Sequence, residues 1–199
     1  VAVNDAESNY GEAKALLFDH VQIPAKNIHR IKGELLPAEA AQAFSAEMSE
    51  MLLKAEGQKV KRPTYDWVLL GVGEDGHTAS LFPGLIDIHS PENCVVASHP
   101  ETKQLRISIT APVIASAKRV SYLVLGAPKA TIVGEVYMAI HNPVANTVLT
   151  SECYPAARIR SALGTTEWYL DRSAAQRINE DVVNDSVVNS STVDHNGEN

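Results

Sequence analysis

The sequence predicts an α/β fold, an open parallel-type sheet flanked by helices on both faces in three α/β/α layers. Two short, continuous apolar runs, 67–72 and 120–125, are typical of strands that are covered on both faces. Segments with helical periodicity lie before and after these runs. Strands that alternate with helices along a chain favour a parallel sheet.

The individual elements follow from local signals. Pro37 opens a helix, since proline is favoured at the first helical position, and Gly57 ends it. Apolar residues recur within this helix at three- and four-residue steps and form one apolar face. In chain order, the other predicted elements are a helix over 10–20, a short strand-like piece near 28–31, strands over 67–72 and 105–110, a helix over 112–117, a strand over 120–125, a helix over 129–140, a strand over 168–170 and a helical turn over 173–178.

The composition is that of an ordinary globular domain. Of the 199 residues, 45% are apolar and 21% are charged, which allows a buried core. The formal net charge of -7 argues against nucleic-acid binding, because a phosphate backbone requires a basic face. No apolar run approaches the roughly 20 residues that a membrane span needs, and no signal peptide is recognisable. We therefore expect no membrane partner and a cytoplasmic location.

One domain is predicted over residues 1–178, followed by an acidic tail over 179–199. The tail has five acidic residues and no Lys or Arg, lacks an apolar face and is expected to be disordered. Cys94 and Cys153 lie far apart without metal-ligand spacing, and we expect two reduced thiols. The histidines show no paired ligand spacing either, so no metal site is expected.

A glycine-rich loop follows the first buried strand and reads G-V-G-E-D-G-H-T-A-S-L-F-P-G over 71–84. Ligands bind beyond the carboxyl ends of parallel strands, where this loop is predicted to lie. Its glycines let the backbone turn sharply and approach a ligand closely. His77 brings an imidazole, the usual general base near neutral pH, and Asp75 can orient that ring or bond a sugar hydroxyl.

The same loop matches the glycine spacing of dinucleotide-binding loops, Gly71-x-Gly73-x-x-Gly76. That pattern works because a helix N-terminus meets a pyrophosphate. Here Glu74 and Asp75 lie inside the loop and would repel the pyrophosphate. No acidic residue ends a strand about 20 positions later, where a ribose would need one. The pattern therefore does not indicate a nucleotide site.

The longer string resembles the signature of the 6-phosphogluconolactonases, in the superfamily that includes the glucosamine-6-phosphate deaminases. Other pieces resemble the family in the same order: S-N-Y at 8–10, R-I-S-I-T at 106–110, G-A-P-K-A at 126–130 and E-W-Y-L-D at 167–171. The resemblance spans about residues 6–178. It implies a cofactor-independent hydrolase of the oxidative pentose phosphate pathway, whose small-molecule substrate is a phosphorylated sugar lactone, 6-phosphogluconolactone.

Two segments that open the family's sequences have no counterpart here. Members of the family begin with a Ser-Gly-Gly-Ser-Thr-Pro-like phosphate loop and an Asp-Glu-Arg loop, both upstream of the segment that resembles Val1 onward. We therefore expect a fragment or a truncated gene product that lacks about the first third of a family member. An incomplete sheet of this kind would have an unpaired edge and an exposed apolar face.

The resemblance also implies roles in the loop. His77 is the predicted general base, which activates water against the lactone carbonyl, and Asp75 orients it or binds a hydroxyl group. The backbone N–H groups of Gly73 and Gly76 are candidates for lining the site and stabilising the oxyanion.

Phosphate binding is assigned to two cations outside the loop. Arg106 offers a planar fork of donors, and Lys129 offers a point charge at the start of a helix, where the macrodipole also attracts anions. Arg158 and Arg160 are weaker candidates for the same role.

Two other functions stay open. Deaminases or isomerases of glucosamine 6-phosphate resemble H-I-A-F-N-E-P at the histidine and use the carboxylate of that segment, whereas 77–83 here reads H-T-A-S-L-F-P. A catalytically inactive sugar-phosphate-binding fragment would bind ligand without turnover. The oligomeric state does not follow from the sequence.

Overall fold

Three parallel strands form the central sheet of the computed structural model, which describes residues 1–56, 62–85, 89–141 and 154–178. They are β1 (Val68–Leu70), β4 (Arg119–Val124) and β5 (Thr165–Leu170), in the order β1-β4-β5. β4 pairs in parallel with both neighbours. The predicted α/β class with a parallel sheet is confirmed.

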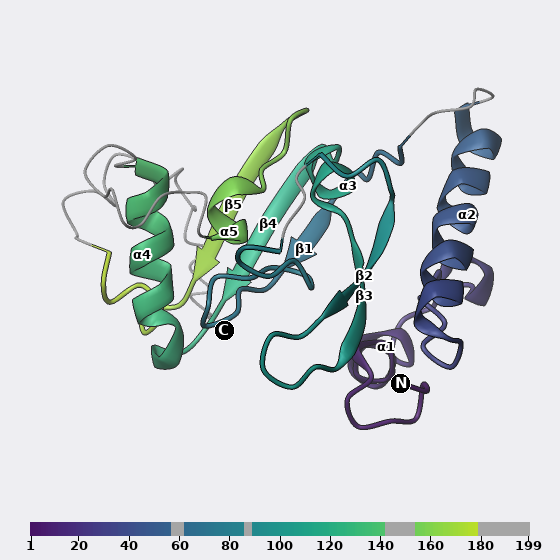
Figure 1. Cartoon of the computed structure of the whole chain (residues 1–199), viewed down its shortest axis with the longest axis horizontal. Coiled ribbons are helices and arrows are strands. Elements are labelled where there is room, and N and C mark those ends of the chain that lie inside the picture. The colour runs from purple at the N-terminus through teal and green to yellow at the C-terminus, as the bar shows by residue number, and fades with distance from the viewer. Residues whose placement is uncertain (57–61, 86–88, 142–153, 179–199) are drawn as a thin grey trace, which may run out of the picture.

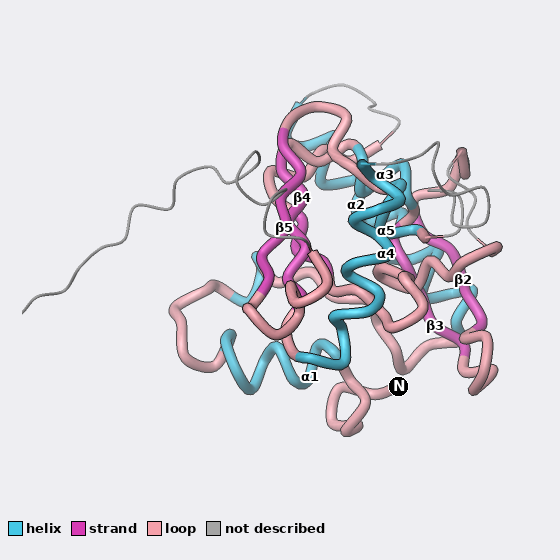
Figure 2. Tube along the Cα trace, turned by 90° about the vertical axis from the view of Figure 1, so that its left-hand side faces the viewer, coloured by secondary structure: helices cyan, strands magenta, loops and turns pink. Residues whose placement is uncertain are grey.

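A separate antiparallel hairpin stands beside this sheet. It consists of β2 (Cys94–Ser98) and β3 (Leu105–Ile109), with Cys94 opposite Ile109 and Ala97 opposite Arg106. In both views β4 and β5 run side by side while the hairpin stands apart from them (Figures 1 and 2). The predicted strand over 105–110 therefore forms, but outside the parallel sheet.

The helices largely follow the local signals. α2 (Pro37–Glu56) begins at its proline, and its last predicted residue, Gly57, lies outside the described residues. The remaining helices are α1 (Asn9–Ala13), continued by a π-helical turn over Lys14–Phe18, then α3 (Ala111–Ala115), α4 (Ala130–His141) and α5 (Pro155–Arg158), with 3-10 turns at Ala25–Asn27 and Ala127–Lys129. In the part of the chain that the structure describes, no helix is long and apolar enough to cross a bilayer.

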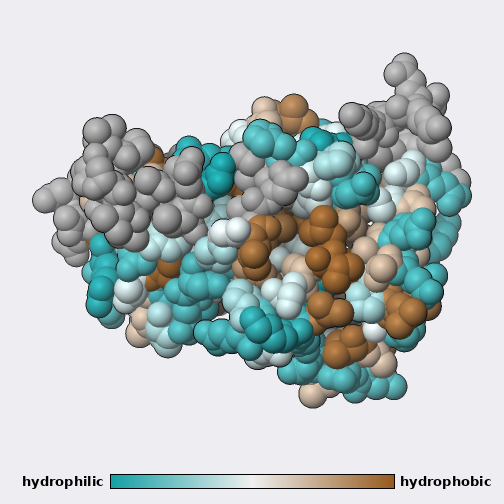
Figure 3. Space-filling model, viewed as in Figure 1, coloured by the Kyte–Doolittle hydropathy of each residue, from teal (hydrophilic) through white to brown (hydrophobic). Residues whose placement is uncertain are grey.

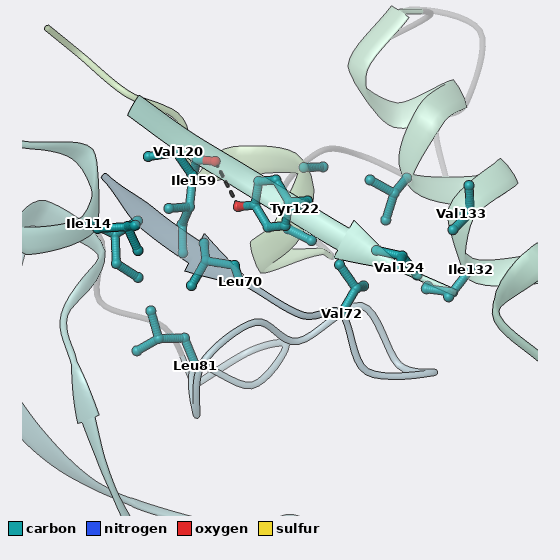
Figure 4. Packing of buried hydrophobic residues seen from close by; sticks show 14 of the residues in the cluster. Leu70, Val72, Leu81, Ile114, Val120, Tyr122, Val124, Ile132, Val133 and Ile159 are labelled. Atoms are coloured by element: carbon teal, nitrogen blue, oxygen red, sulfur yellow. Dashed lines mark hydrogen bonds between the residues drawn. The ribbon is translucent and has the colours of Figure 1, made fainter. Parts of the chain in front are cut away.

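The core lies on one face of the parallel sheet. Even-numbered residues of β1 and β4 point to this face and pack against α3, α4 and α5, as Figure 4 shows for Leu70, Tyr122 and Val124. Tyr122 is fully buried, stacks on Trp168 with ring centroids 4.2 Å apart and donates its hydroxyl to the Ile159 carbonyl at 2.8 Å. The buried hydroxyl is thus satisfied, as its position requires.

The opposite face of the sheet is open. Leu69 is 62% exposed and Leu123 is 53% exposed, although parallel sheets are ordinarily covered on both faces. Near the start of the strands, the Arg119 guanidinium lies 4.6 Å from the Trp67 ring centroid and pairs with Glu167 at 2.8 Å. Hydrophobic side chains also gather in the middle of the view in Figure 3. The sequence predicts helices on both faces, whereas the helices packed on this sheet in the described residues lie on one.

The exposed leucines of the open sheet face predict self-association of the chain. We expect the chain to associate as its concentration rises, because exposed leucines on a flat sheet gain free energy when they are buried. Replacing Leu69 and Leu123 by Gln should lower the weight-average sedimentation coefficient at high concentration. Leu163→Gln, at an equally exposed leucine before β5, is the matched control. A parent chain that stays monomeric at every concentration would contradict the prediction.

The hairpin has two faces with different partners. Cys94 and Ile107 on one face pack against Met48 of α2. Burial raises the pKa of the Cys94 thiol to about 11, so the group stays a thiol near neutral pH. Cys94 is a free cysteine, as predicted, and Cys153 lies outside the described residues, as does the acidic tail. The other face of the hairpin is turned toward the loop that follows β1.

Candidate active site

The loop after β1 closes into a tight turn at its glycines. The Gly76 N–H donates to the Gly73 carbonyl at 3.0 Å, and the Gly73 N–H donates to the His77 carbonyl at 2.9 Å. At the base of the loop, the Thr78 hydroxyl donates to the Gly71 carbonyl at 2.9 Å. Both glycine N–H groups are therefore used within the turn. The expectation that they serve as oxyanion donors does not agree with this geometry.

The two glycines instead make room for neighbouring rings. Gly76 has φ +80, a backbone conformation that residues with a side chain rarely adopt. A Cβ at Gly76 would collide with the Tyr154 ring, and a Cβ at Gly73 would collide with the His77 imidazole. Glycine is thus required at both positions to hold the imidazole against the turn.

His77 and Asp75 form a hydrogen-bonded pair inside this turn. His77 Nδ1 lies 2.6 Å from Asp75 Oδ1, and the His77 backbone N–H donates to the same oxygen at 3.0 Å. An ionised carboxylate only accepts, so the neutral imidazole carries its proton on Nδ1 and leaves an acceptor lone pair on Nε2. The His77 side chain is 22% exposed and that of Asp75 46% exposed. The imidazole is therefore partly buried but remains accessible to solvent.

The same contacts keep the carboxylate charged. Burial by itself would raise the pKa of Asp75, but the hydrogen bonds from the His77 backbone and imidazole, together with the charge of the imidazolium, outweigh it. The net pKa of Asp75 lies below its ordinary value of 3.8. Asp75 is therefore a carboxylate throughout the neutral range and holds the Nδ1–H tautomer of His77 in place.

A buried phenylalanine supports the imidazole from beneath. Phe82 is only 1% exposed, and its ring centroid lies 4.9 Å from that of His77. His99, which follows β2, meets the Phe82 ring edge-on at 5.2 Å. The His99 Nδ1 accepts hydrogen bonds from the N–H groups of Glu101 and Thr102 at 3.3 and 3.2 Å, which fixes this second ring. Phe82 thus links the His77 loop to the segment that follows β2.

The strand that carries Arg106 also contacts the loop. The Ser80 N–H donates to the Ser108 hydroxyl at 3.0 Å, so this face of β3 contacts the loop directly. Arg106 lies two residues earlier on the same face, about 6.7 Å along the strand. Its Nε donates to the Gln104 side chain at 3.2 Å, and Gln104 in turn donates to Glu7 at 2.9 Å.

Lys129 lies at the same edge of the sheet as His77. β1 and β4 are adjacent and parallel, so the loops that follow them emerge side by side. Lys129 ends the 3-10 turn between β4 and α4, whose start is fixed by the Gly126 N–H bonded to both carboxylate oxygens of Asp171 at 3.1 Å. The position is suited to an anion, because α4 begins at the next residue.

The weaker cationic candidates lie on or after α5. This short helix also contacts the loop, since the Ala156 N–H donates to the Gly76 carbonyl at 3.1 Å. Arg158 is the last residue of α5, and the exposed Arg160 lies just beyond it. The start of the helix, at Ala156, is thus the part of this segment that contacts the His77 turn.

Two hollows of the described surface lie along α2, one beside Phe44 and Glu47 and the other between α2 and Cys94. Neither of these two includes a residue of the His77 loop, and neither has a histidine in its lining. The carboxylate–imidazole pair, which can take up and release a proton, therefore defines the candidate site. Among the described residues, no three His, Cys, Asp or Glu side chains cluster as metal ligands would.

Comparisons with known proteins identify the family of the chain. Residues 1–168 match the family described as glucosamine-6-phosphate isomerases/6-phosphogluconolactonase. The chain is 47% identical to the 6-phosphogluconolactonase of Aggregatibacter actinomycetemcomitans and 46% identical to that of Haemophilus influenzae, in each case over 89% of this chain and 70% of the relative. The chain belongs to the 6-phosphogluconolactonase family. A crystal structure of the devB protein, 52% identical, superposes on this lactonase-family chain with a TM-score of 0.77 and covers 90% of it and 70% of the other chain.

Three aromatic side chains of this lactonase-family site were not assigned roles by sequence reasoning. Phe82 lies within the signature string, but its position under the imidazole depends on the fold of the loop. His99 and Tyr154 come from segments distant in sequence. For Tyr154 the only local signal is Pro155, which opens α5.

Proposed function

We propose that this chain hydrolyses 6-phospho-D-glucono-1,5-lactone to 6-phosphogluconate, with His77 as the general base. Membership in the lactonase family supports the substrate. The observation that carries the mechanism is the 2.6 Å contact between His77 Nδ1 and Asp75 Oδ1. It leaves Nε2 as a proton acceptor on a loop at the carboxyl edge of the sheet, where substrates bind in such folds.

In the proposed reaction, Nε2 takes a proton from water as the water oxygen adds to lactone C1. Asp75 stabilises the imidazolium that forms. As the tetrahedral intermediate collapses, the bond between C1 and the ring oxygen breaks, and this oxygen receives the proton from Nε2. The carboxylic acid product then loses one proton to solvent. No covalent enzyme intermediate is needed, because one positioned base suffices for an already reactive ester.

Arg106 and Lys129 are the proposed anchors for the phosphate. The hydrogen bond between Ser80 and Ser108 holds the face of β3 that carries Arg106 against the loop. Lys129 approaches from the start of α4 at the same sheet edge. An arginine fork and a lysine point charge on either side of an anion would hold the sugar ring and leave C1 to the base.

The test is lactone hydrolysis by the purified chain. Freshly generated lactone hydrolyses spontaneously, so proton release is followed at constant pH with and without protein. We expect the rate of proton release with protein to exceed the spontaneous rate and to saturate as the lactone concentration rises. Ammonia release from glucosamine 6-phosphate is measured in parallel and is expected to be absent. Lactone binding without turnover would contradict the proposal in favour of an inactive binding fragment.

A change of Asp75 to Asn tests the orienting carboxylate. The amide keeps the size of the side chain but loses the charge that stabilises the imidazolium and holds the proton on Nδ1. We expect kcat to fall on the order of 10²-fold, part of what a positioned base contributes, with little change in KM. Initial rates over a range of lactone concentrations separate the two constants. A fall confined to KM would instead make Asp75 a ligand for a sugar hydroxyl.

A further inference from the structure

A tyrosine and a glutamate from outside the loop brace the turn that carries His77. Tyr154 precedes α5, and its ring lies so close to Gly76 that no Cβ fits there. The Tyr154 hydroxyl donates to Glu135 Oε2 of α4 at 2.8 Å. The side chain is thus fixed at both ends, by the turn and by the helix.

The contact acts on the peptide next to the base. Gly76 immediately precedes His77, its carbonyl accepts the Ala156 N–H, and its backbone has φ +80. The Asp75–His77 bond orients the ring relative to the turn, but it does not fix the turn relative to the sheet. That second task requires contacts from other elements, and Tyr154 provides one directly at the turn.

We propose that the Tyr154–Glu135 hydrogen bond positions the His77 turn, so that Nε2 meets the attacking water in the right place. Tyr154 and Glu135 are positioning residues and do not touch the substrate. The proposal rests on the proposed lactonase function. It extends that function from the carboxylate–imidazole pair to α4, more than 50 residues further along the chain by number.

Tyr154→Phe is the first test, because it keeps the ring on Gly76 and removes only the hydroxyl. We expect kcat to fall several-fold while KM stays near the parent value, since a small displacement of a reacting group is costly in rate. Tyr169→Phe is the matched control. It removes a tyrosine hydroxyl that donates to a carboxylate, Glu167, at 3.0 Å on the open sheet face, and should leave both constants unchanged.

Glu135 completes a double-mutant cycle. Glu135→Leu should reproduce the loss seen in Tyr154→Phe, and the double variant should be no worse than either single variant, because both changes remove the same bond. Glu135→Gln keeps an oxygen acceptor and should restore most of kcat. Additive losses, or an unchanged kcat in Tyr154→Phe, would overturn the proposal.

A readout independent of turnover separates this proposal from the proposed function. The hydrogen-exchange rate of the Ala156 amide reports whether the turn stays docked, because this N–H donates to the Gly76 carbonyl. We expect faster exchange of this amide in Tyr154→Phe than in the parent, and an unchanged rate in Tyr169→Phe. If the parent proves inactive but the exchange rate rises in Tyr154→Phe, the function fails and the positioning stands. If the parent is active and neither kcat nor the exchange rate responds, the positioning fails alone.

Discussion

Replacing His77 by Ala is expected to remove the lactonase rate down to the spontaneous reaction. A positioned general base typically contributes about 10²- to 10⁴-fold, and no second imidazole lies in the same turn. The chain should stay folded with a modest loss of stability, because the imidazole is partly buried against Phe82 and Asp75 remains partly solvated. Proton release with fresh lactone measures the rate, and thermal unfolding measures the fold.

His20→Ala is the control for that substitution. His20 is exposed and bonds the Ala15 carbonyl at 2.9 Å, so its loss removes an imidazole without touching the loop. Its rate should equal that of the parent. A His77→Ala variant that still turns over like the parent would show that the assigned base is wrong, whatever the family of the chain.

Replacing Gly76 by Ala is expected to reduce both stability and turnover. A left-handed backbone costs an alanine about 1–2 kcal/mol, and the added methyl group also collides with the Tyr154 ring. Relief of that collision must move either Tyr154 or the His77 turn. A displacement of His77 by about 1 Å is expected to lower kcat on the order of 10²-fold.

Gly84→Ala separates the two causes. Gly84 has φ +71, but a Cβ there meets no described atom within 4 Å. This control should therefore show the backbone cost alone and keep its turnover. Urea unfolding gives the free energies of unfolding, and lactone hydrolysis gives kcat. Equal losses of turnover in both variants would mean that the collision with Tyr154 has no part in catalysis.

Local signals predicted those helices and strands whose own residues mark their start or their apolar core face. Pro37 marks the start of α2, and the apolar runs mark β1 and β4, because a strand covered by helices needs apolar residues whatever its partners are. β2 was not predicted, since Cys94–Ser98 is recognisable as a strand only when paired with β3. The strand-like piece near 28–31 pairs with no strand among the described residues.

Two further differences have specific causes. α5 has four residues, too few to show helical periodicity. The predicted helical turn over 173–178 forms turns rather than a helix. There the Asp171 carboxylate accepts the N–H of Ala174 at 2.7 Å and also that of Gly126, so it joins this segment to the start of α4. Such contacts between distant segments are invisible to local patterns.

The candidate site also contains residues that local sequence predicts and residues whose contacts depend on the fold. Asp75 and His77 were predictable because both lie in one turn, and residue type and spacing suffice to pair them. Phe82 under the ring is local in sequence, but its contact depends on the path of the loop. Tyr154 and Glu135 become neighbours of the turn only when α4 and α5 pack on the sheet. Asp75 could thus be predicted from the sequence as the partner of His77, whereas the contacts of Tyr154 and Glu135 with the turn could not.

Asp75 and His77 are paired inside a single turn, so their contact depends on few residues. The base and the group that sets its proton are separated by one residue and cannot drift apart while the turn persists. The proposed phosphate anchors, in contrast, come from the hairpin and from the start of α4, and their spacing depends on the whole assembly of layers. In the proposed mechanism, the pairing of the base with its carboxylate is therefore a short-range property of the chain, whereas the placement of their turn and the capture of substrate depend on contacts between distant segments.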